Sequence, residues 1–87
     1  MPCYLISYDL LKSRDYEPLY AAIKAYGTWA HIHESFWAIV TSYSAIQIRD
    51  DLLQHVDADD RIFVVKSGGE AAWRGVICKS EWLKEHI

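Results

Sequence analysis

The stretch Tyr-Leu-Ile-Ser-Tyr-Asp at residues 4–9 decides the fold, because it is a strand with apolar residues on both faces. Side chains alternate along a strand, so Tyr4, Ile6 and Tyr8 point to one face and their neighbours to the other. Such a strand is expected in the middle of a sheet, where neither face is freely exposed to water. Asp9 then stands where the chain leaves the sheet, and it is the first candidate for a functional carboxylate.

Two helices and three further strands are predicted downstream of this stretch. The first helix is expected over residues 15–26, with Asp15 as its N-cap and Gly27 ending it. A second helix is expected over residues 44–56, where Ser44 and Gln47 have the spacing of a capping box. Strands are predicted over residues 28–34, 36–41 and 61–66, in which aromatic and β-branched residues are frequent.

This order of elements, β-α-β-β-α-β, predicts an α+β fold of the ferredoxin-like type. Its four-stranded antiparallel sheet would carry both helices on one face and leave the other face bare. The chain of 87 residues is long enough for one domain, 1–87, whose core spans about residues 3–67.

A short C-terminal extension follows this core over residues 70–87. It includes a predicted helix over residues 80–86 with Ser80 as its cap. Trp73 and Trp82 are large enough to require a packing partner, either the edge of the sheet or a second subunit. The pattern leaves these two alternatives open.

The composition favours a single domain without a broad nucleic-acid-binding surface. The formal net charge is −3, whereas contact with many backbone phosphates requires clustered positive charge. Cys3 and Cys78 match no metal-ligand spacing and are expected to be reduced, buried residues of a cytosolic protein. The chain enters its first strand directly and its apolar runs are short, so neither a signal peptide nor a membrane span is expected. A cytoplasmic protein is therefore predicted.

The helix-free face of the sheet is expected to be covered by a second copy of the chain. The sequence contains four Trp and six Tyr residues, more than a small core holds. If every second residue of each predicted strand points to the helix-free face, one consistent choice places the following residues there: Tyr4, Ile6, Tyr8, Trp29, His31, His33, Phe36, Ala38, Val40, Ile62, Val64 and Lys66. Stacked RNA bases are the other candidate cover, but the aromatic-plus-glycine signature of such sheets is absent. A homodimer is therefore predicted, with Tyr4, Ile6, Tyr8, Trp29 and His31 at its interface.

Asp9 has two interpretations. A carboxylate after a strand often caps the following loop. Alternatively it binds Mg²⁺ or Mn²⁺, provided that a two-fold axis brings a second Asp9 alongside, because these cations require several oxygen ligands. His31 and His33 are a second metal candidate, for which ring packing is the favoured alternative. The sequence has no serine in a nucleophile motif and no phosphate-binding glycine loop.

Several short segments carry a family resemblance. Tyr8-Asp9-Leu10 closes the first strand, Arg14 precedes the first helix, and an aromatic-rich hairpin follows that helix. Residues 4–9, 44–50 and 60–64 add to the likeness. With these segments in this order, the chain resembles the CRISPR-associated Cas-two and VapD superfamily, and in particular its small SinR-family members.

The resemblance implies a ferredoxin-like homodimer in which Asp9 matches the acidic residue that binds a divalent metal at the dimer interface of nuclease members. It also implies hydrolysis of RNA or DNA phosphodiester bonds with Mg²⁺ or Mn²⁺, in a defence or toxin-type system. Arg14 is then a candidate for phosphate contact, and Ser7 and Tyr8 for shaping the site. The alternative left open is a non-catalytic dimeric module that binds another protein or nucleic acid.

Overall fold

The computed structural model describes residues 1–10 and 17–87. The elements in chain order are β1 (Cys3–Asp9), α1 (Glu17–Lys24), β2 (Thr28–His33), β3 (Phe36–Val40), α2 (Ala45–Leu53), β4 (Arg61–Lys66) and α3 (Ser80–His86). Each strand and helix predicted from the sequence is present within a few residues of its expected bounds. The predicted cap of the first helix, Asp15, lies outside the described residues.

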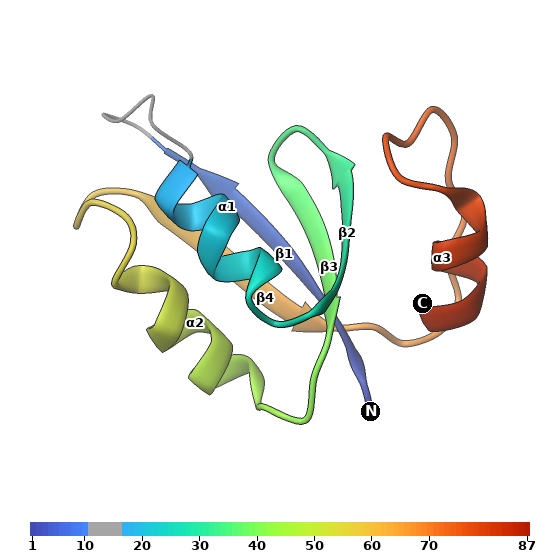
Figure 1. Ribbon diagram of the computed structural model, residues 1–87, viewed down its shortest axis with the longest axis horizontal. Helices are drawn as coiled ribbons and strands as arrows, with labels where there is room; N and C mark the ends of the chain where they lie inside the picture. Colours follow the sequence, from blue (N-terminus) through green and yellow to red (C-terminus); the bar gives the residue numbers. More distant parts are fainter. Residues whose placement is uncertain (11–16) are drawn as a thin grey trace.

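The four strands form one antiparallel sheet in the order β2-β3-β1-β4. The first strand therefore lies inside the sheet, as its two apolar faces predicted. Figure 1 shows α1 and α2 lying across one face of the sheet, whereas α3 lies beside β2 and away from them. The molecule is thus a small α+β fold with a four-stranded antiparallel sheet and three helices. In the part of the chain that the structure describes, no helix is long and apolar enough to cross a membrane.

The main core lies between the sheet and the pair α1 and α2. Its buried members are Tyr4, Ile6, Tyr8, Leu19, Ile23, Trp37, Ile39, Ile48 and Leu52. The antiparallel register places Ile6 opposite Trp37 on β3 and opposite Val64 on β4, so these side chains share the helix-covered face. The predicted capping box fixes the start of α2, because Ser44 and Gln47 each accept a hydrogen bond from the other's backbone N–H.

The predicted assignment of faces is wrong for β1 and β4 and, in β2, for Trp29 and His31, whereas His33 lies opposite Phe36. Tyr4, Ile6 and Tyr8 point toward the helices and are at most 7% exposed, so they do not line a helix-free interface. Trp29 and His31 lie opposite Ile39 and Trp37 and share that helix-covered face, as Ile62, Val64 and Lys66 do. Because β1 is apolar on both faces, its alternation does not determine which set meets the helices. The assignment of Phe36, Ala38 and Val40 to the opposite face is confirmed.

The C-terminal extension covers part of the helix-free face and forms a second core there. Its buried members are Cys3, Ala30, Ile32, Ala38 and Leu83, with Trp73 and Trp82 packed against them. The extension is held by two hydrogen bonds, from the Ile77 N–H to the Ile32 carbonyl (2.8 Å) and from the Ser67 hydroxyl to the Ile87 carbonyl (2.6 Å). Within the described protomer, the two tryptophans therefore pack on their own sheet.

The start of α3 differs from the prediction. The N-cap is Lys79, which makes no side-chain capping bond. Ser80 is the first helical residue, and its hydroxyl accepts a hydrogen bond from the Trp73 indole N–H (3.2 Å). The serine thus ties the helix to the preceding loop instead of capping it.

Candidate functional site

The carboxylate of Asp9 lies at the end of β1, on the helix-free side of the sheet. It stands opposite Arg61, the first residue of β4, and their side chains approach to 3.9 Å between Arg61 Nη1 and Asp9 Oδ2. Both side chains are about two-thirds exposed or more, at 69% for Asp9 and 71% for Arg61. An exposed ion pair at this separation contributes roughly 0–1 kcal/mol, so a competing cation or phosphate could separate the pair at little cost.

Apolar side chains lie next to this ion pair. Phe63 and Val65 follow Arg61 on the same face of β4 and are 65% and 41% exposed. Ser7 lies opposite Phe63 and is half-buried. We call Ser7, Asp9, Arg61, Phe63 and Val65 the open β1–β4 face. This surface is the part of the helix-free side that the C-terminal extension leaves uncovered. It was not predicted from the sequence, because the alternate residues of β4 (Ile62, Val64 and Lys66) were assigned to this side.

Of the residues predicted to shape the Asp9 site, the structure places Ser7 on its face but Tyr8 on the other. Tyr8 is 3% exposed, and its hydroxyl donates to the Glu34 carbonyl and accepts from the Trp37 indole N–H, each at 3.1 Å. Tyr8 therefore supports the turn between β2 and β3 from inside the core. The predicted phosphate contact, Arg14, lies outside the described residues.

The histidines of β2 serve ring packing. The His31 ring stacks on Trp37 with centroids 4.0 Å apart and planes 10° apart, and the Tyr20 ring meets it edge to face with centroids 5.4 Å apart. A register irregularity follows His31, and His33 lies beside Phe36 instead. Across residues 1–10 and 17–87, no three His, Cys, Asp or Glu side chains gather closely enough to hold a metal ion. Among the described residues, Asp9 is the single carboxylate of the open β1–β4 face, whereas Mg²⁺ and Mn²⁺ take several oxygen ligands.

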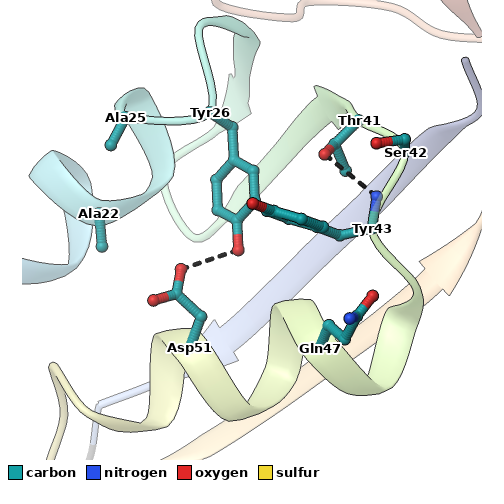
Figure 2. A pocket seen from close by; sticks show the side chains of 8 residues that line it. All are labelled: Ala22, Ala25, Tyr26, Thr41, Ser42, Tyr43, Gln47 and Asp51. Carbon is teal, nitrogen blue, oxygen red and sulfur yellow. Dashed lines mark hydrogen bonds between the residues drawn. The ribbon is translucent and has the colours of Figure 1, made fainter.

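A separate pocket of about 750 Å³ lies between α1 and α2. Figure 2 shows its lining: Ala22, Ala25, Tyr26, Thr41, Ser42, Tyr43, Gln47 and Asp51. The Tyr26 hydroxyl donates a 2.7 Å hydrogen bond to Asp51 Oδ2, and the rings of Tyr26 and Tyr43 meet edge to face with centroids 6.1 Å apart. No sequence motif singles out Tyr26 or Asp51 as a site residue. No sequence spacing joins these two residues, because they come from different helical segments.

The environment of Tyr26 raises the pKa of its phenol well above the ordinary value of 10.0. The largest cause is burial, which disfavours the phenolate, and the next is the hydrogen bond to Asp51, whose charge adds to the effect. At neutral pH the phenol is therefore a firm donor to the carboxylate.

We expect Tyr26 to titrate above the ordinary tyrosine pKa in an alkaline ultraviolet difference titration. Because the folded state holds this proton more tightly than the unfolded chain, the free energy of unfolding should fall as pH rises above the ordinary tyrosine pKa. Tyr26→Phe should remove a titration step that lies above the ordinary tyrosine pKa. Asp51→Asn should lower its midpoint without restoring the ordinary value, since burial remains; Asp50→Asn, which removes a carboxylate paired with Arg49, should leave it unchanged.

No family model matches the chain.

Proposed function

We propose that the chain is a ferredoxin-like homodimer of the Cas-two and VapD type that hydrolyses RNA or DNA phosphodiester bonds with Mg²⁺ or Mn²⁺ in the cytoplasm. The observation that carries the proposal is the position of Asp9. It stands exposed at the end of a central strand, on the same face as the exposed side chains of Phe63 and Val65. A partner that covers this apolar surface would also approach the carboxylate.

A second copy is a suitable partner for the open β1–β4 face. A two-fold axis makes an isologous interface, in which each copy buries the same patch against the other. Phe63 and Val65 would lose their contact with water, which favours association by about 25 cal/mol for each Å² of apolar area. The C-terminal extension occupies the β2 and β3 side of the sheet, so the interface would be narrower than the whole face and closer to Asp9.

The residues of this face fit a divalent cation once two copies meet. Mg²⁺ is usually held by one or two carboxylates and keeps several waters, and paired Asp9 side chains match that requirement. A cation held there would supply Lewis-acid stabilisation of the charge that develops on the phosphodiester. Arg61 would be the phosphate-binding residue in this scheme. Once a cation displaces it from Asp9, its guanidinium would bind and orient a phosphate, with Ser7 beside it. Arg14 remains a proposed second phosphate contact.

The Asp9→Asn substitution tests the proposal. Purified protein should cleave RNA or DNA in the presence of Mg²⁺ or Mn²⁺, and the variant should show no cleavage above the metal-free background while remaining dimeric in sedimentation. Asp50→Asn removes an exposed carboxylate on α2 that is also paired with an arginine, and this variant should cleave normally. Cleavage that survives Asp9→Asn would assign the activity to another site or a contaminant. A monomer at working concentrations would remove the basis for paired carboxylates.

A non-catalytic dimeric interaction module is the second candidate function. The ion pair with Arg61 favours it, because Asp9 already has a cationic partner in the protomer. This candidate predicts one stoichiometric protein partner in a pull-down, together with no cleavage and no nucleic-acid mobility shift at low salt. The proposed nuclease instead predicts cleavage and a nucleic-acid mobility shift.

A further inference from the structure

The pocket between α1 and α2 lies on the helix-covered side of the protein, whereas Asp9 lies on the opposite, helix-free side. Among its lining residues, Asp51 is the single charged side chain. Its carboxylate accepts a hydrogen bond from the neutral Tyr26 hydroxyl, and no ion pair joins it to a lysine or arginine of the described ranges. The neighbouring Asp50, by contrast, pairs with Arg49 at 2.9 Å. The pocket therefore presents a negative charge that the described part of the protein does not neutralise.

Two aromatic rings stand beside this charge. The planes of Tyr26 and Tyr43 are 81° apart, so the rings form two nearly perpendicular surfaces near the carboxylate (Figure 2). Tyr43 is 53% exposed, so a ligand in the pocket can reach its ring from solvent. The faces of aromatic rings attract cations, and perpendicular rings near a carboxylate are a favourable environment for an ammonium or guanidinium group.

The walls of the pocket are held in place before any ligand arrives. The hydrogen bond to Asp51 fixes Tyr26, and the Tyr43 N–H donates to Thr41 Oγ1 at 3.3 Å. Ala22 and Ala25 supply small side chains from the α1 side, which leaves the space open. A site whose walls are already ordered binds with a smaller loss of conformational entropy.

An anionic ligand does not fit this arrangement. No lysine or arginine is among the lining residues. At the nearby start of α2, the Gln47 N–H is already bonded to the Ser44 hydroxyl and the Ser44 N–H to the Gln47 side chain. The net charge of −3 also favours the approach of a cation over that of an anion.

We propose that this pocket binds an organic cation, through a guanidinium or ammonium group that contacts the Asp51 carboxylate and lies against the Tyr43 ring. The cation comes either from a free polyamine or from a basic side chain of a peptide. The inference is independent of the proposed nuclease function, because Asp9 and Arg61 have no part in it.

The test is a titration of the full-length protein followed by amide chemical shifts in nuclear magnetic resonance. Three cationic probes are used, namely acetyl-arginine amide, acetyl-Gly-Arg-Gly amide and spermidine. Acetyl-citrulline amide is the matched probe, because it has nearly the same shape without the charge. Saturable shifts at Tyr43, Gln47 and Asp51 are expected with the cations, and at least about tenfold weaker binding with citrulline.

Variants separate the pocket from general attraction to an acidic protein. Asp51→Asn retains an acceptor for the Tyr26 hydroxyl and should weaken binding of the cations at least about tenfold, whereas Asp50→Asn should not change it. Tyr43→Leu should weaken binding about two- to fivefold. Tighter binding of the peptide than of spermidine would identify a basic peptide side chain as the natural source of the cation. Tighter binding of spermidine would identify a polyamine.

Three results would overturn the inference. They are the absence of saturable shifts with all cationic probes at low salt, equal binding of the citrulline probe, and equal weakening by Asp50→Asn and Asp51→Asn. Circular dichroism of each variant shows that its fold is retained. Cleavage assays on the same variants should give wild-type rates, so a failure here and a failure of the nuclease proposal are separately visible.

Discussion

Replacing Trp37 with alanine should lower the free energy of unfolding by about 3–5 kcal/mol, the usual cost of removing a buried tryptophan or phenylalanine. Trp37 is 1% exposed and is the second residue of β3, in the main core between the sheet and the helices α1 and α2. Its ring contacts three aromatic neighbours: Tyr20, Trp29 and His31, with centroids between 4.0 and 5.5 Å away. Its indole N–H also donates to the Tyr8 hydroxyl, so the substitution leaves a cavity and removes a buried hydrogen bond.

This loss is large relative to the stability of a small domain, which is roughly 5–15 kcal/mol. Urea unfolding followed by circular dichroism should show a much lower midpoint, or a variant already partly unfolded in water. Trp29→Ala is the matched control. Trp29 lies on β2, on the same face of the sheet as Trp37, but is 36% exposed. It makes one cation–π contact, with Lys24 at 5.1 Å, and should cost less than half as much. Equal losses for the two variants would contradict a core centred on Trp37.

The succession of strands and helices could be predicted because local signals determine it. Ser44 and Gln47 form the capping box that their spacing predicted. Gly27 has a φ of +93°, a conformation that other residues rarely adopt, and it follows α1 where the sequence analysis ended the helix. In these places a few neighbouring residues contain all the necessary information.

The faces of the sheet could not be predicted in the same way. β1 alternates between two apolar sets, so either set could meet the helices, and the chosen one was wrong. The deciding contact is the pairing of Ile6 with Trp37, which depends on residues 31 positions apart. Phe63 and Val65 were therefore assigned to the helix-covered core, and the exposed surface that they form beside Asp9 was not predicted.

The two sites were predictable to different degrees. The exposed position of Asp9 at the end of a central strand followed from the alternation of a single segment. Its pairing with Arg61 depends on the register between β1 and β4, and the pocket of Tyr26 and Asp51 depends on the packing of α1 against α2. Neither arrangement is encoded by a short motif, so each became visible when tertiary structure brought distant segments together.

The second large effect is expected for Leu83→Ala, which should cost about 2–5 kcal/mol and release the C-terminal extension from the sheet. Leu83 is 2% exposed and packs above Ala30 and Ala38, two small residues that lie opposite each other on β2 and β3. α3 has seven residues and no side-chain capping bond, and a helix this short is unstable in isolation. Its structure therefore depends on this contact with the sheet.

Native-state hydrogen exchange should locate the loss. In Leu83→Ala the amides of α3 should lose protection first, while those around Ile6 and Ile39 should stay protected, because the main core lies on the other side of the sheet. Leu53→Ala makes the same substitution at a position of α2 that is 44% exposed, and it should leave protection of α3 unchanged. If Leu83→Ala lowered protection equally in both cores, the extension and the sheet would unfold as one cooperative unit. The extension would then be required for the stability of the open β1–β4 face, because α3 and β1 share the second core through Leu83 and Cys3.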